Sequence, residues 1–324
     1  MPLTPPSPDR VMRRLLFLSF ALAASAGTPC LAGAQQTGPW RIDTTVTLAR
    51  GGTVDLSLVS GDITVTAGTG DQVRVRGMSE RVPFVFERST SAVRVRLENS
   101  NCDGKRGRHD DCNGEERLEV SVPTGTRVIG NSVSGTVRVR GVNGEIEAQS
   151  VSGDVEVDGA QRRADLHSVS GDVTGRSLQG NVRAQSVSGD VELQSVTGEV
   201  NAESVSGDVT LRGMRSDRVE VETVSGEVLY DGSFSRDGRY DFKSHSGDVR
   251  LIMPADVAAS LEVRTFSGDI DSDFQMTLDP GSEPGRRRDR SMSFKLNGGG
   301  ARVTAETFSG TVNLERAGAR SNRE

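Results

Sequence analysis

The sequence predicts an all-β protein, a parallel β-solenoid or β-helix-like stack with coils of about 18–21 residues. Glycine is abundant and aromatic residues are scarce, with 38 glycines in 324 residues and an aromatic content of 4%. A Ser-Gly-Asp triplet recurs along the chain, and apolar residues alternate with polar residues on both sides of it, which is typical of strands in a repeat architecture. An antiparallel meander is the competing arrangement, and Asn143-Gly144 is a good hairpin signal for it.

The first element, residues 1–34, has the layout of a signal peptide. Three arginines precede the apolar run 15–24, and an Ala-Gly-Ala triplet stands directly before Gln35, as at a cleavage site. The apolar run is too short to cross about 30 Å of hydrocarbon. We therefore expect an exported protein, periplasmic or secreted and associated with the cell surface, with no transmembrane segment after signal cleavage.

Residues 35–41 form a linker, and residues 42–128 hold irregular β coils with a cysteine-containing loop. Cys102 and Cys112 stand in a polar segment between two β-like runs. Export to an oxidising compartment predicts a disulfide between them. The alternative is a metal site that adds His109 and the two aspartates after it, although mixed soft and hard ligands are a weak signal.

The regular core, residues 129–212, carries the clearest repeat. Its Val-Ser-Gly form recurs at equal intervals, and weaker forms fall halfway between them, so one coil would hold two short strands and two turns. Glycine takes a positive φ at a corner without penalty, and Ser and Asp side chains hydrogen-bond free backbone groups. The predicted structural turns are at Gly61, Gly135, Gly144, Gly153, Gly171, Gly180, Gly189, Gly198, Gly207, Gly226, Gly247, Gly268 and Gly310.

Valines at fixed offsets from the glycine predict the core. They stand two residues before it, as at Val133 and Val151, and two residues after it, as at Val155 and Val173. This alternation predicts that both positions are buried. Equivalent positions keep the same residue type, as coils stacked about 4.8 Å apart require.

Residues 213–316 are predicted to form wider coils and a cap. The interval between turn glycines grows, as from Gly226 to Gly247, and most of the later aromatic residues lie here. Bulky side chains would cover the end of a stack that otherwise exposes its core; a ligand platform is the alternative. Residues 284–290 form a basic, solvated loop, and residues 317–324 are expected to be a disordered tail.

Composition and motifs argue against an enzyme. The net charge of −6 and the low aromatic content do not fit a nucleic-acid binder. No G-x-S-x-G, H-E-x-x-H or P-loop motif is present. The aspartates recur at every coil, whereas an active site is a local exception in a repeat. We predict no catalytic, cofactor-binding or metal residues. The alternatives are a carbohydrate-active β-helix enzyme, which needs converging carboxylates, and a calcium-stabilised extracellular repeat.

Several segments resemble the bacterial putative-adhesin family. They are the VSGDVEV repeats, VSVPTGT (120–126), LIMPADVAASLEVRTFSGDI (251–270) and GGGARVTAETFSGTVNL (298–314). The resemblance covers roughly residues 40–316 and implies a β-solenoid-like fold in an exported or envelope protein, without catalytic residues to carry over. We therefore predict a noncatalytic, exported cell-envelope protein, an adhesin-like binding or structural module. Its partner would be an envelope or extracellular ligand, protein or glycan.

Overall fold

The computed structural model describes residues 39–80, 82–98, 116–275, 277–278 and 290–318, all within the unit Gly38–Glu324. These residues form strands and no helix, which confirms the all-β prediction. The predicted signal peptide, Cys102 and Cys112, and most of the basic loop and of the tail lie outside the described residues.

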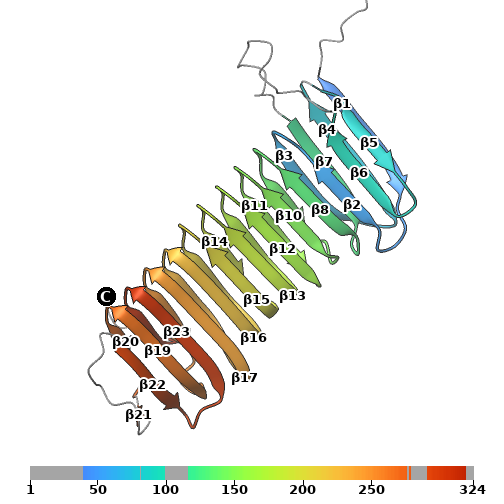
Figure 1. Cartoon of the computed structure of the whole chain (residues 1–324). Coiled ribbons are helices and arrows are strands. Elements are labelled where there is room, and N and C mark those ends of the chain that lie inside the picture. Colours follow the sequence, from blue (N-terminus) through green and yellow to red (C-terminus); the bar gives the residue numbers. More distant parts are fainter. Residues whose placement is uncertain (1–38, 81, 99–115, 276, 279–289, 319–324) are drawn as a thin grey trace, which may run out of the picture. The chain divides into compact units, whose positions relative to one another are not determined.

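Two rows of parallel strands run along this unit, and the Ser-Gly-Asp turns connect one row to the other (Figure 1). We call the row that enters these turns the leading ladder and the row that leaves them the trailing ladder. The leading ladder contains β6 (Ala92–Leu97), β2 (Thr53–Ser57), β8 (Arg127–Ser132), β10 (Ile146–Ser150), β12 (Arg163–Ser168), β15 (Thr197–Ser204), β23 (Ala301–Ser309) and β19 (Ala259–Ser267). The trailing ladder contains β7 (Glu116–Pro123), β3 (Asp62–Gly68), β9 (Val137–Arg140), β11 (Val155–Ala160), β14 (Val191–Gln194), β18 (Val249–Met253), β24 (Val312–Arg316) and β20 (Ile270–Ser272). Three longer strands contribute to both ladders, namely β13 (Val173–Ser186), β16 (Val209–Ser225) and β17 (Val228–Ser246).

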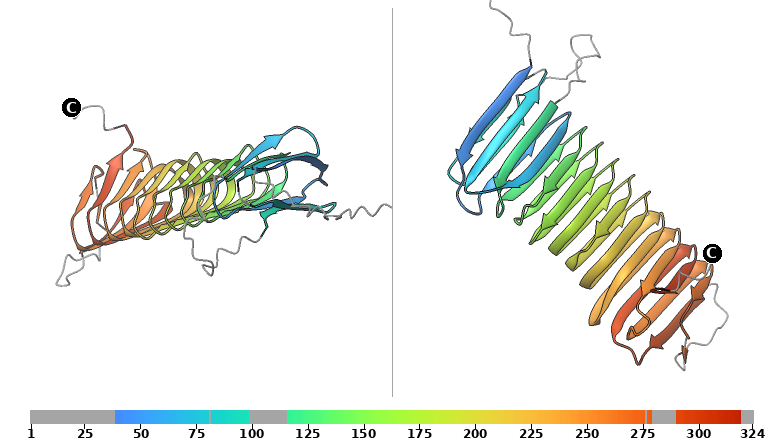
Figure 2. Two further views of the ribbon diagram at one scale, coloured as in Figure 1. Left: turned by 90° about the horizontal axis from the view of Figure 1, so that it is seen from above. Right: turned by 180° about the vertical axis from the view of Figure 1, so that it is seen from behind.

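The register confirms the solenoid and its repeat. Ile146 pairs in parallel with Val128 on one side and with Ala164 on the other, one sequence repeat away in each direction. Further along, Val219 pairs with Tyr240, so the coil is longer there. Parallel pairing at one-coil intervals excludes the antiparallel meander in this region. Equivalent positions therefore stack along each row, and Figure 2 shows the stacked coils from two further sides.

The coil order departs from the chain order at both ends. Near the N-terminal end, β2 lies between β6 and β8, and β3 lies between β7 and β9. Near the C-terminal end, β23 lies between β17 and β19, and β24 lies between β18 and β20. Antiparallel strands complete the ends, namely β1 (Trp40–Thr47), β4 (Gln72–Ser79), β5 (Phe84–Arg88), β21 (Thr277–Leu278) and β22 (Arg290–Leu296).

The interior holds small branched side chains in the regular coils and aromatic side chains in the wider ones. Val155, Val173 and Val191 are fully buried. Tyr230 and Tyr240 are also fully buried, with ring centroids 6.0 Å apart. These two tyrosines lie inside a wide coil with further coils beyond it, rather than over the end of the stack. The larger coil is therefore filled by larger residues.

Candidate functional site

In the Val-Ser-Gly turns, the valine two residues before the glycine points outward: Val133, Val151 and Val205 are 44%, 45% and 44% exposed. The prediction that this position is buried is wrong for these turns, and it is correct at Val142 and Val196, which are fully buried. The residue just before each outward valine points inward instead, as at Ser186, which is 4% exposed. Because side chains alternate along a strand, a buried serine requires an outward valine.

The buried serine ties neighbouring turns together. The Oγ of Ser186 donates a hydrogen bond to the carbonyl oxygen of Gly171, at 3.0 Å. The same Oγ accepts one from the backbone N–H of Gly189, also at 3.0 Å. Ser150 and Ser168 repeat both bonds in their own coils. The turn thus uses the serine three residues before the glycine.

The turn glycines of the regular core are held by close contact between coils. A Cβ added to Gly189 would lie 2.2 Å from the carbonyl oxygen of Gly171, and one on Gly171 would lie 2.3 Å from that of Gly153. The φ angles of these glycines lie outside the left-handed region. A positive φ, which we expected from the sequence to be the reason for glycine at the turns, therefore does not explain these positions. It does explain Gly180 and Gly198, where φ is 94° and 122°.

The outward valines form a continuous line, which we call the apolar row. Backbone bonds join its successive turns, for example from Ser188 N–H to the carbonyl of Val169 and from Ser206 N–H to that of Val187, each at 2.9 Å. In stacking order, the row contains Val59, Val133, Val151, Val169, Val187, Val205, Val224, His245, Phe308 and Phe266.

The C-terminal end of the apolar row is aromatic. The rings of His245 and Phe308 stack with centroids 4.9 Å apart, and those of Phe308 and Phe266 stack at 4.7 Å. An open groove of about 670 Å³ runs beside these rings. Its other wall carries alternating charges, Glu222, Lys243, Glu306 and Arg264, on neighbouring strands.

Four exposed aspartates form a second line beside the apolar row, which we call the acidic row: Asp154, Asp172, Asp190 and Asp208. Each follows a turn glycine, and its Oδ1 accepts the backbone N–H of the residue one coil further on, at distances of 2.7–3.0 Å. Within the described ranges, none of the four takes part in an ion pair. The acidic row therefore adds uncompensated negative charge to the edge of the solenoid.

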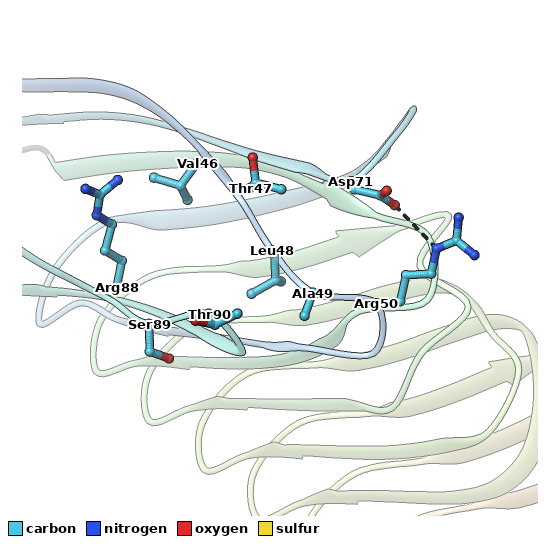
Figure 3. A pocket seen from close by; sticks show the side chains of 9 residues that line it. All are labelled: Val46, Thr47, Leu48, Ala49, Arg50, Asp71, Arg88, Ser89 and Thr90. Carbon is cyan, nitrogen blue, oxygen red and sulfur yellow. Dashed lines mark ion pairs between the residues drawn. The ribbon is translucent and has the colours of Figure 1, made fainter.

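A second groove, of about 680 Å³, lies near the N-terminal end (Figure 3). Val46, Leu48 and Thr90 are among its lining residues. Its one ion pair joins Arg50 Nε and Asp71 Oδ1, at 3.8 Å, and both side chains are largely exposed. The lining of this groove mixes apolar residues with the charged residues Arg50, Asp71 and Arg88.

The structure places the predicted site residues as follows. The turn glycines Gly135 and Gly226 stack against neighbouring turns, Gly61 stacks against the backbone of Glu116, and Gly144 stacks against the backbone of Thr126. His167 pairs in the leading ladder, and His245 lies on the apolar row. In the part of the chain that is described, no three His, Cys, Asp or Glu residues are grouped as metal ligands would be.

These features define a class of protein, a parallel β-solenoid with a turn edge that carries one apolar and one acidic row. The chain belongs to the Toastrack DUF4097 family, whose profile matches residues 43–315. A comparison with curated proteins finds no match. Among the described residues, no helix is long and apolar enough to span a membrane.

Three crystal structures are similar to this chain at low identity. A "putative cell adhesion protein" from Clostridium sporogenes is 8% identical, with 86% of this chain and 100% of that chain covered and a TM-score of 0.23. A "putative lipid binding protein" from Parabacteroides distasonis is 11% identical, with coverage of 86% and 98% and a TM-score of 0.35. A "putative adhesin" from the same organism is also 11% identical, with coverage of 86% and 97% and a TM-score of 0.33.

Proposed function

We propose that this protein is a noncatalytic, exported module of the cell envelope that binds its ligand along the apolar row. The observation that supports this proposal is the exposure of eight large apolar side chains, each 38–47% exposed, that all lie on this one row. Contiguous apolar patches of more than a few hundred Å² on a soluble protein mark interaction sites. A row repeated at about 4.8 Å per coil would suit an elongated partner.

The arrangement of carboxylates favours binding over catalysis. Glycoside cleavage needs two carboxyl groups in different environments at one place. In the acidic row every carboxylate makes the same bond to a backbone N–H one coil further on. A set of equivalent carboxylates does not separate an acid from a base, so we propose no reaction.

Export is part of the proposal, and the cysteines offer a direct test of it. We propose that cleavage before Gln35 releases the mature protein and that Cys102 and Cys112 form a disulfide. Closing a loop of this size would stabilise the fold by about 2–3 kcal/mol. Intact mass and non-reduced peptide mapping of the protein from its producing cells should show both features. Free thiols on an uncleaved chain would contradict the proposal.

Binding is tested by retention on envelope fractions of the producing cells. We expect the wild-type protein to be retained and the variant Val151→Thr/Val187→Thr/Val205→Thr to be lost, because threonine keeps the shape of valine and removes its apolar character. The control is Ile129→Thr on the flat face of β8, which should be retained. A polysaccharide panel is assayed in parallel for new reducing ends. Equal retention of the triple variant, or release of reducing ends, would overturn the proposal.

A further inference from the structure

We propose that the ligand of the turn edge is a basic amphipathic polypeptide segment, bound as a helix along the apolar and acidic rows. This inference rests on the proposed function and names the chemistry of its partner. It is carried by the parallel course of the two rows, since four successive coils of the regular core each place one valine and one aspartate on the same edge.

The negative charge of the edge favours a positively charged partner. Asp154, Asp172, Asp190 and Asp208 are exposed on successive coils and have no cationic partner in the described chain. Their spacing of about 4.8 Å is shorter than the screening length of about 8 Å at physiological ionic strength. Each carboxylate therefore adds to the field of the next, and lysine or arginine side chains facing the row would relieve this repulsion.

The spacing between coils favours a helical partner over an extended one. A helix returns the same face every turn, about 5.4 Å, which is close to the coil spacing of about 4.8 Å. An extended strand returns the same face after two residues, about 6.6 Å. From Val133 to Phe266 the row makes eight steps, or about 38 Å, which a helix of about 25 residues covers.

Two other occupants fit the charge less well. An anionic membrane surface would meet the acidic row with charge of the same sign. A second copy would bring another acidic row and another net charge of −6 to the interface. An apolar helix flanked by basic side chains satisfies both rows at once, in the manner of helices that dock an apolar face into a partner.

The test measures fluorescence anisotropy of a labelled helical peptide of about 25 residues, with leucine on one face and lysine beside it. The matched probe replaces every lysine with glutamate. We expect the lysine peptide to bind the full-length protein at least about tenfold more tightly than the glutamate peptide at low salt. In the variant Asp154→Asn/Asp172→Asn/Asp190→Asn, the amide oxygen of each asparagine can still accept the backbone N–H, but the negative charge is removed. We expect it to lose about tenfold in affinity and most of the salt dependence.

The control is Asp158→Asn, the same change at the other end of β11, which should bind like the wild type. Val151→Thr/Val187→Thr/Val205→Thr should weaken the lysine peptide at both low and high salt. Equal binding of the two peptides, or unchanged binding by the aspartate variant, overturns this inference. It is also overturned if vesicles rich in anionic lipid bind, or if the protein self-associates through the valines. Envelope retention that depends on the valines would then still support the proposed function.

Discussion

The Oδ1 of Asp190 accepts a 2.9 Å hydrogen bond from the backbone N–H of Asp208, which lies one coil further along the stack. Asp172 makes the same bond to Asp190. Hydrogen bonds to an ionised acceptor are stronger than neutral ones. Each coil thus caps the turn of the next, and the recurring aspartate has a structural role in addition to its charge.

Replacing Gly189 with alanine should destabilise the protein by about 1–3 kcal/mol. The new Cβ would lie 2.2 Å from the carbonyl oxygen of Gly171 and 2.5 Å from its carbon, and backbone atoms cannot move aside as a side chain can. Gly125→Ala is the control, because nothing lies within 4 Å of its Cβ position. Urea denaturation measures both variants. Similar midpoints for the two would show that the coils are not in close contact at Gly189.

Ser186→Ala should cost about 1–3 kcal/mol, whereas Ser188→Ala should cost less than about 0.5 kcal/mol. The first change leaves the N–H of Gly189 and the carbonyl of Gly171 without the side chain that bonds them. Ser188, in contrast, is exposed. The comparison uses free energies of unfolding from denaturant titrations. The reverse order would assign the turn's hydrogen bonds to the wrong serine.

Sodium chloride and calcium chloride at matched ionic strength should raise the melting temperature by similar amounts. One oxygen of each acidic-row aspartate already accepts a backbone N–H, and Ca²⁺ needs six to eight oxygen ligands. Screening of like charges is then the main effect of either salt. Saturable stabilisation at micromolar Ca²⁺, absent with Na⁺ and Mg²⁺, would instead support the calcium-stabilised repeat.

The stability of the wide coil should fall as the pH rises above about 10. Burial raises the pKa of Tyr230 and of Tyr240, so the folded chain keeps both phenols neutral after the unfolded chain has begun to ionise. This contribution is complete below the unfolded pKa and is lost as the pH rises through the folded pKa. Tyr230→Phe should flatten the loss of stability between about pH 9 and 11, relative to the wild type, in urea titrations. Parallel pH profiles would contradict this expectation.

The sequence was sufficient to predict the solenoid because its repeat is nearly exact where the coils are regular. An identical residue at a fixed interval implies a parallel ladder, and the pairing of Ile146 with Val128 and Ala164 follows that rule. The inserted coils at the ends could not be predicted in this way. Nothing in the local pattern of β23 indicates that it pairs with β17, because that pairing joins Tyr240 to Val303, which are far apart in the sequence.

The apolar row was not predicted, because alternating side chains point to two faces of a strand and the alternation does not say which of the two sets is buried. The set predicted to be buried contained Val151, whereas the structure exposes it and buries Ser150. Hydrophobicity alone favours the predicted set. The deciding factor is the hydrogen bonding of the buried serine, since Ser150 Oγ bonds to both Gly135 and Gly153. The repeated serine three residues before the glycine was the available signal.

The place of β23 and β24 has a consequence for the order in which the chain assembles. These strands belong to the last stretch of the sequence, yet each fills a slot between two strands that precede it in the chain. A nascent chain therefore cannot close its C-terminal end by adding coils one after another. Until residues 301–316 arrive, β17 and β19 leave open edges, which are templates for aggregation. A chain that crosses a membrane in an extended form would cover these open edges only after its last strands, β23 and β24, have emerged.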